Sequence, residues 1–339
     1  MKIPLILTGV ILLNLGGPDS LQAVRPFLYN LFSDREIIRL GPAPMQKPLA
    51  WLISTLRSPK TEKMYSQIGG KSPILDITRA QAVALEEALN KKSNSPHSFK
   101  VYIGMRYWRP FTEEVVEQMS RDGIKKVIGL SLYPQYSVTT SGSSISEFRK
   151  AASRYGMEII IVDSWHNHPL YIEALVDVIN KGIESFSPSA SGREPSSLIL
   201  HPSSLDNIHV LFSAHSLPQK IIDQGDPYVD QTVETIREIE KLLPITWHLS
   251  YQSKSGPVKW LEPSTEDKLE ELAHAGIKNV LVVPISFVSD HIETLYEIDI
   301  LYKDLAGKLG INLKRTESLN DHPKFIAALQ DIVEKSLKN

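Results

Sequence analysis

Short apolar runs alternate along the chain with longer segments in which apolar positions recur at helical spacing. The apolar runs predict strands at residues 11–15, 101–105, 127–132, 159–162, 210–214 and 280–287. Between them, helical spacing predicts helices at residues 78–88, 112–119, 169–183, 226–243 and 265–273. Strands that alternate with helices are typical of βαβ units, so the sequence predicts an α/β protein with parallel sheets.

Two stretches of the sequence resemble each other. Residues 122–127 read DGIKKV and residues 275–280 read AGIKNV, and each leads through an apolar run to a proline, Pro134 or Pro284. Both are typical of a helix that ends on glycine before a strand begins. We therefore predict two similar doubly wound halves that face each other across a central cleft. The first half comprises residues 1–158 and 310–339, with the final helix 323–337 packed back on it, and the second comprises residues 159–309.

Carboxylates gather where the apolar run 280–287 gives way to a helical pattern. In a helix that begins at Asp290, the residues Asp290, Glu293 and Glu297 are spaced i, i+3 and i+7, so their carboxylates share one face. Such a stripe attracts cations, and strand ends are where open α/β sheets bind their ligands. A second interpretation is a capping box, with Asp290 as the N-cap, Glu293 reaching back to it and Glu297 solvated.

A histidine, His215, directly follows the predicted strand 210–214. A strand-end imidazole can exchange protons near neutral pH. The alternative is a core histidine that is hydrogen-bonded to a backbone carbonyl. The functional interpretation gains support because His215 and Glu293 belong to different strand ends that are expected to face one cleft.

Two further motifs are weaker candidates. His166 and His168 form an H-x-H pair, but Pro169 is a natural first helical residue, so we interpret the pair as the loop that enters that helix rather than as a metal site. The run 139–144, TTSGSS, follows a strand and opens a helix. Its amides and hydroxyls would suit a carboxylate or a phosphate, and a plain helix cap explains it as well.

The proline-rich segment 41–57 is unusually apolar. Either this segment is core, or it forms a lip that meets lipid or a flat apolar ligand. Cations at either end would face anionic groups in the second case. The apolar residues are Trp51, Leu52, Ile53 and Leu56, and the flanking cations are Lys47, Arg57 and Lys60.

Composition narrows the classes of function. At 339 residues the chain is long enough for two domains, and 37 basic against 39 acidic residues give no support for a nucleic-acid partner. There is no cysteine, which excludes disulfides, thiolate zinc sites, a cysteine nucleophile and a cysteine-ligated iron–sulfur cluster. Any metal would therefore be held by oxygen and imidazole.

The apolar start of the chain, residues 3–15, is too short to span a bilayer and is not followed by a cleavage pattern of small residues. We interpret it as a buried first strand and expect a cytoplasmic protein. Residues 185–207 are rich in serine, proline and glycine, so we expect a surface insertion there.

Ordered motifs along nearly the whole chain resemble the ferrochelatase family, whose members insert ferrous iron into a porphyrin to make haem. These are LNLGGP (13–18), GMRY (104–107), LYPQYS (132–137), SAHSLP (213–218), YQSKSGP (251–257) and SDHIETLYE (289–297). The resemblance implies two Rossmann-like, chelatase-type halves with the porphyrin in the cleft. It implies a lyase of haem biosynthesis that forms protohaem from protoporphyrin IX with release of two protons.

The resemblance also assigns roles to residues. His215 and Glu293 match the family's histidine and acid of metal binding and proton transfer, and Glu297 matches a position that lines the cavity. Apart from the resemblance, the carboxylates of Asp290 and Glu297 would suit a path for protons or the metal. The positions that match the family's porphyrin site are Arg57, Tyr65, Ser72, Arg106 and Trp260. Leu15 resembles protoporphyrin-type members, since coproporphyrin-type members tend to carry tyrosine there.

The expected partners are a porphyrin and ferrous iron as substrates, with no prosthetic group and no nucleic acid. The segment 42–56 is expected to make at most a peripheral contact with the inner face of the membrane. The chain departs from the family in its lack of cysteine, which many members use for an iron–sulfur cluster, and in the length of the insertion. The alternatives are a chelatase for another metal or tetrapyrrole, such as cobalt or coproporphyrin, and a non-catalytic porphyrin-binding protein.

Overall fold

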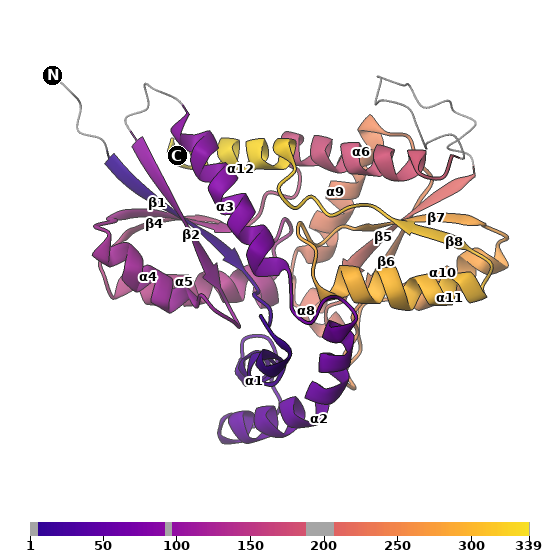
Figure 1. Cartoon of the computed structure of the whole chain (residues 1–339), viewed down its shortest axis with the longest axis horizontal. Coiled ribbons are helices and arrows are strands. Elements are labelled where there is room, and N and C mark those ends of the chain that lie inside the picture. Colours follow the sequence, from indigo (N-terminus) through magenta and orange to yellow (C-terminus); the bar gives the residue numbers. More distant parts are fainter. Residues whose placement is uncertain (1–5, 92–96, 188–206, 339) are drawn as a thin grey trace.

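The computed structural model describes residues 6–91, 97–187 and 207–338 and contains two four-stranded parallel sheets (Figure 1). The first has the order β2-β1-β3-β4, with β1 (Ile6–Asn14), β2 (His97–Met105), β3 (Lys126–Ser131) and β4 (Glu158–Val162). The second has the corresponding order β6-β5-β7-β8, with β5 (Ile208–His215), β6 (Trp247–Gln252), β7 (Asn279–Pro284) and β8 (Asn312–Arg315). The predicted α/β class and the paired sheets are confirmed.

Helices connect the strands in both halves. Those associated with the first sheet are η1 (Leu21–Ala23), α1 (Val24–Ser33), η2 (Ala43–Met45), α2 (Gln46–Ser66), α3 (Ile74–Asn90), α4 (Thr112–Arg121), η3 (Val138–Gly142) and α5 (Ser143–Ser153). The helix α6 (Pro169–Glu184) leads to the second sheet. It is followed by α8 (Gln219–Asp223), α9 (Tyr228–Leu242), α10 (Thr265–His274), η4 (Glu293–Tyr302), α11 (Lys303–Lys308) and α12 (Pro323–Ser336).

Alternate side chains of β1 divide the interior into layers. Val10 and Leu12 face a core that runs through both halves, whereas Ile11 and Leu13 face a separate core under α4 and α5. The shared core also contains residues of α3, α6, α9 and α12, which Figure 1 shows along one side of both sheets. Burial of one continuous apolar layer therefore joins the two sheets.

The final helix α12 packs against α3 and α6 and also contacts β3 and β4 of the first sheet. The predicted division into 1–158 with 310–339 and 159–309 stays a prediction. Most of the predicted insertion, residues 188–206, lies outside the described residues.

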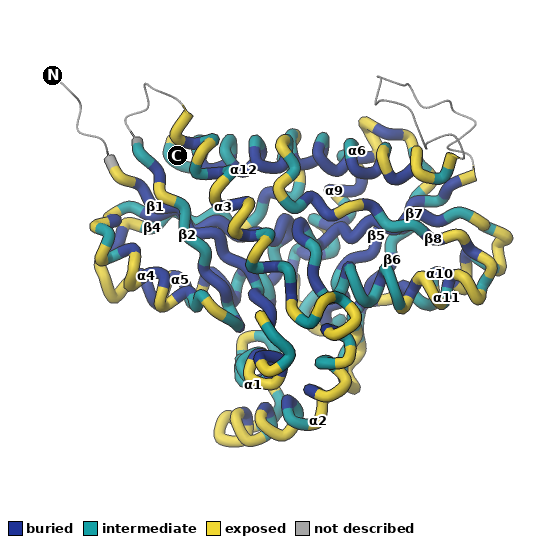
Figure 2. The backbone as a smooth tube through the Cα atoms, in the orientation of Figure 1, coloured by how far each residue is buried: buried dark blue, intermediate teal, exposed yellow. Residues whose placement is uncertain are grey.

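Helices α1 and α2 project from the layered body, and much of α2 is exposed (Figure 2). They pack on each other through a small cluster that includes Phe27, Phe32 and Ala50. In the part of the chain that the structure describes, no helix combines the length and apolar character needed to cross a membrane.

Two strands were missing from the predicted set. The edge strand β8 has no apolar run, and only Leu313 is fully buried in it. At the opposite edge, β6 mixes polar with apolar residues in the sequence WHLSYQ. The predicted strand 280–287 was too long: β7 ends at Pro284, and residues 285–286 already form a turn.

Candidate active site

His215 and Glu293 come together at one edge of the second sheet. The central strands β5 and β7 are adjacent and parallel, so their carboxyl ends meet at the same edge. His215 is the last residue of β5, and Glu293 begins η4 after β7. The imidazole Nδ1 of His215 lies 2.9 Å from Oε2 of Glu293, and the side chains are 30% and 15% exposed.

Polar groups hold the main chain of His215 in place. Its N–H donates to Oγ of Ser286 over 3.1 Å, and the hydroxyl of Tyr228 donates to its carbonyl over 2.9 Å. The Tyr228 hydroxyl and Ser286 Oγ are themselves 2.6 Å apart. The main chain at the end of β5 is therefore fixed, and the contact with Glu293 orients the imidazole on it.

The pair perturbs the proton affinities of both partners. Burial alone would lower the pKa of His215, but the charge and hydrogen bond of Glu293, with the charge of Glu297, raise it. Burial likewise opposes the ionised form of Glu293, yet His215, His291 and Ser253 together hold the pKa of Glu293 below its ordinary value. The contact thus favours the protonated imidazole of His215 and the ionised carboxylate of Glu293.

Ser253 links the two glutamates of η4. Its hydroxyl lies 2.7 Å from Oε2 of Glu293 and 2.5 Å from Oε2 of Glu297. Burial, with the charge of Glu293, raises the pKa of Glu297 to about 8. Since the hydroxyl has one hydrogen, it serves one carboxylate at a time, and a proton held by Glu297 would satisfy the second contact.

Sequence reasoning did not single out Ser253, and it did not single out His291. His291 is 4% exposed, and its Nδ1 is 3.1 Å from the carbonyl of Ser289. Its Nε2 is buried without a hydrogen-bond partner among the described residues. Burial lowers the pKa of His291, which favours the neutral form of this imidazole. The H-x-E spacing of His291 and Glu293 was the available signal.

The helical stripe predicted from Asp290 requires a correction. The helix η4 is a π-helix that begins at Glu293, so Asp290 precedes it. Asp290 instead contacts the end of β8 and the chain after it: its Oδ1 lies 3.0 Å from Nη1 of Arg315, the last residue of β8, and its Oδ2 lies 3.1 Å from Nδ2 of Asn320. Glu293 and Glu297 alone share the contact with Ser253.

Three of the predicted porphyrin-site residues lie in α2 or just after it, in the part of the first half that faces this edge of the second sheet. Tyr65, on α2, is 3% exposed, and burial, with the charge of Glu293, raises its pKa. Ser72 is 5% exposed and packs directly against Gly17. A Cβ added at Gly17 would lie 2.5 Å from Oγ of Ser72. Arg57 donates from Nη1 to Oγ of Ser255 over 2.7 Å, which joins α2 to the loop after β6.

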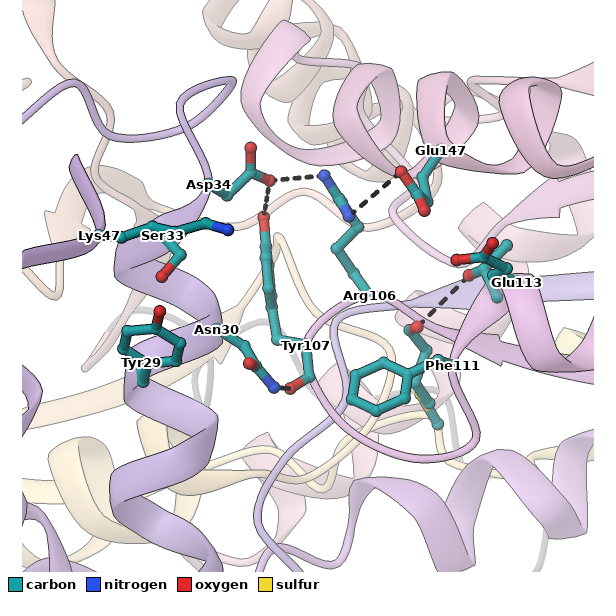
Figure 3. A pocket seen from close by; sticks show the side chains of 12 residues that line it. Tyr29, Asn30, Ser33, Asp34, Lys47, Arg106, Tyr107, Phe111, Glu113 and Glu147 are labelled. Atoms are coloured by element: carbon teal, nitrogen blue, oxygen red, sulfur yellow. Dashed lines mark hydrogen bonds and ion pairs between the residues drawn. The ribbon is translucent and has the colours of Figure 1, made fainter. Parts of the chain in front are cut away.

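The other two predicted porphyrin-site residues, Trp260 and Arg106, lie outside α2 and the residues just after it. The indole Nε1 of Trp260 is 3.4 Å from the carbonyl of Gly256, within the loop after β6. Arg106 lines a cavity of about 460 Å³ (Figure 3). There it forms a 2.7 Å ion pair with Asp34 and approaches Glu147 at 3.7 Å. The substrate roles of all five residues stay predictions.

The weaker motifs have structural partners. His166 and His168 bind different carboxylates, those of Glu234 and Asp331, each over 2.9 Å, and no cluster of metal-ligating residues occurs in the described ranges. The helix start after residue 137 holds a carboxylate of the chain itself: Oδ2 of Asp226 accepts from the N–H of Val138 over 2.8 Å.

The segment 41–57 is not simply core. Trp51, Leu52 and Leu56 are 55%, 46% and 71% exposed on α2, whereas Ala50 is fully buried. We call the exposed side chains Trp51, Leu52 and Leu56 the α2 lip.

Comparisons with known proteins agree with one another. The ferrochelatase family model matches residues 7–337. A ferrochelatase of Geotalea uraniireducens is 48% identical over 336 residues, with 98% of both chains covered. One of Gloeothece citriformis is 50% identical over 337 residues, covering 97% of this chain and 82% of that protein. The fold is similar to that of SirB from Bacillus subtilis with Fe3+, with a TM-score of 0.53 and 14% identity over 97% of this chain and 95% of that chain.

Replacing Glu293 by glutamine tests the electrostatic pairing. Without the negative charge, burial is left as the main influence, so we expect the pKa of His215 in the Glu293→Gln protein to fall below its wild-type value. An NMR pH titration of the His215 ring protons in metal-free protein measures this. The Glu270→Gln change, at an exposed site on α10, is the control and should leave that pKa unchanged. An unshifted His215 in Glu293→Gln would contradict the pairing.

Proposed function

The chain belongs to the ferrochelatase family and so inserts iron into a porphyrin in haem synthesis, and we propose that His215 and Glu293 carry out this reaction. The observation that carries the proposal is the 2.9 Å contact between Nδ1 of His215 and Oε2 of Glu293 at the shared edge of β5 and β7. In reaction class the enzyme is a lyase that joins ferrous iron to protoporphyrin IX and releases two protons.

His215 is suited to meet the metal or a pyrrole proton with its other nitrogen. In a neutral ring whose Nδ1–H donates to Glu293, Nε2 carries no proton and can act as an acceptor. A carboxylate behind a ligating imidazole fixes the tautomer and raises its basicity. Imidazole nitrogen and carboxylate oxygen bind ferrous iron less firmly than thiolate does, which suits a metal that must be passed on to the porphyrin.

Metal insertion also requires that two pyrrole protons leave the site. Ser253 connects Glu293 to Glu297, and the pKa of about 8 for Glu297 lets that carboxyl hold a proton near neutral pH and release it. We assign the proton path to Glu293, Ser253 and Glu297. Asp290, which was predicted to share this path, is held by Arg315 instead.

The porphyrin would lie between this edge and the first half. Arg57 and Ser72 offer a guanidinium and a hydroxyl to the propionates, and Tyr65 and Trp260 offer aromatic surface. Arg57 would then exchange Ser255 for a propionate. Arg106 is assigned to the wall of the site in the first half. The protoporphyrin type rests on Leu15, as the resemblance to the family implies.

We further propose a cytoplasmic enzyme that touches the inner membrane face through the α2 lip. Arg57 and Lys60 follow the exposed apolar residues on the same helix, and Lys47 precedes them. Aromatic and aliphatic side chains with neighbouring cations suit the boundary of an anionic bilayer. A peripheral contact would shorten the route of an apolar porphyrin into the site.

The test of the function is anaerobic incubation of the protein with protoporphyrin IX and ferrous iron, followed by loss of porphyrin fluorescence and appearance of haem absorbance. We expect turnover by the wild type and a loss of about 100-fold or more in kcat for Glu293→Gln, because a positioned acid–base group is removed. Porphyrin binding should persist, and Glu270→Gln should match the wild type.

Other outcomes separate the alternatives. Porphyrin binding without metallation by any divalent ion would favour a carrier. Faster insertion of cobalt than of iron, or metallation of coproporphyrin alone, would replace the assigned substrates. Full turnover by Glu293→Gln would remove its role.

The membrane contact is tested by flotation with vesicles that contain anionic lipid. We expect the wild type to float with them, and the double change Trp51→Ser with Leu56→Ser to reduce binding by about tenfold or more, since each large apolar side chain contributes about 1.5–3 kcal/mol when buried. Val83→Ser is the control, at a 60% exposed site on α3. A wild type that stays in the dense fraction would exclude the contact.

A further inference from the structure

Two non-glycine residues in the described ranges have a left-handed backbone, Ser253 with φ 66° and Asn320 with φ 45°. This conformation is unfavourable for residues other than glycine, and it persists only where the surroundings impose it, often at functional sites. Ser253 holds the carboxylates of Glu293 and Glu297. Asn320 holds Asp290, three positions before Glu293. Both left-handed residues therefore act on the same short segment.

The side chain of Asn320 binds both the main chain and the side chain of Asp290. Its Oδ1 accepts the N–H of Asp290 over 3.0 Å, and its Nδ2 donates to Oδ2 of Asp290 over 3.1 Å. The N–H of Asn320 donates to the carbonyl of Val288 over 2.7 Å. Glycine would adopt this backbone more easily but would make neither amide contact, so the side chain is the reason for an asparagine here.

The other oxygen of Asp290 is fully engaged. Oδ1 accepts from Arg315 over 3.0 Å, from Ser318 over 2.8 Å and from Thr294 over 2.9 Å. Arg315 also forms two hydrogen bonds, of 2.9 and 2.8 Å, with the carboxylate of Asp299 within η4. The end of β8 and the chain after it thus fix both the approach to η4 and its middle.

The first half of the molecule reaches the same point through Gln81 of α3. This side chain is fully buried, and its Nε2 donates to the carbonyl of Asn320 over 2.8 Å and to Oγ of Ser289 over 2.9 Å. A buried amide with defined partners fixes the relative position of the elements that it joins. The start of η4 is thereby set against the half that carries Tyr65 and Ser72.

We propose that Asn320 is a positioning residue for metal insertion. Its left-handed backbone and its amide together fix where Asp290 lies, and hence where η4 begins and how Glu293 meets His215. In this arrangement Asp290 is an anchor for η4 rather than a relay for protons or metal. The inference rests on the proposed function, because its effect on catalysis passes through Glu293.

The test compares three single changes with one exchange. Asn320→Gly keeps the backbone conformation and removes the amide, Asn320→Ala removes both, and Asn320→Asp places a carboxylate against that of Asp290. In the exchange, Asp290→Asn is combined with Asn320→Asp, so that the introduced amide donates to the introduced carboxylate across the same contact. Asn312→Ala is the control, because Asn312 lies at the other end of β8. Its side chain is exposed and binds Asn279 of β7.

We expect Asn320→Gly and Asn320→Ala to lower kcat for iron insertion by about 10- to 100-fold, because a small displacement of Glu293 from His215 is costly even when the change lies away from the chemistry. Porphyrin affinity should stay within about twofold of the wild type, and Asn312→Ala should be unaffected. The exchange should recover most of the rate lost in Asn320→Asp. Amide hydrogen exchange of residues 290–302 should be faster in Asn320→Gly than in the wild type. In the double variant Asp290→Asn with Asn320→Asp it should return toward the wild-type rate.

Several results would overturn the inference. These are wild-type kcat in Asn320→Gly, an exchange variant no better than Asn320→Asp, an equal loss of porphyrin affinity and of kcat, or unchanged hydrogen exchange in η4. If the wild type itself made no haem, the proposed function would fail, and hydrogen exchange would still decide whether Asn320 positions η4.

Discussion

A carboxylate and an imidazole that are largely removed from water are unstable unless their surroundings satisfy them, and the contact between Glu293 and His215, whose side chains are 15% and 30% exposed, is such a pair. The free-energy cost of removing the two groups from water is offset by their mutual attraction and by hydrogen bonds from neighbouring groups. Ser253 donates to Glu293, and Gln252 donates from Nε2 to the carbonyl of Glu293 over 3.1 Å. The molecule supplies these partners from the ends of three adjacent strands, β5, β6 and β7, which explains why the site lies at this edge of the second sheet.

The scaffold holds the pair rigid in two ways. One apolar layer passes through both halves, so that the half that carries α2 and α3 is a fixed wall rather than a loosely tethered domain. Polar contacts then fix η4 along its length, through Asp290 and Asp299 on one side and through Ser253 on the other. A residue that must bind a metal and then release it benefits from such preorganisation, because little has to move when the substrate arrives.

The sequence predicted much of this arrangement, for identifiable reasons. The central strands are apolar on both faces, so β1, β5 and β7 were visible as continuous runs, and the residues at their ends, including His215, could be assigned to one edge. Edge strands bury less, which is why β8 was not predicted. The π-helical form of η4 depends on tertiary contacts, so α-helical spacing placed Asp290 on the stripe of Glu293 and Glu297. Likewise, the ion pair of Arg106 with Asp34 joins residues far apart in the chain and has no local signature.

The central claim is that Glu293 and His215 work as one unit in iron insertion, and a double-mutant cycle on single-turnover rates tests it most directly. The rates of the wild type, Glu293→Gln, His215→Ala and the double variant would be compared with protoporphyrin IX prebound and ferrous iron added anaerobically. Residues that act as a unit are non-additive. We expect the double variant to be no slower than the slower single variant, whereas rate losses that multiply would show that the two residues act independently.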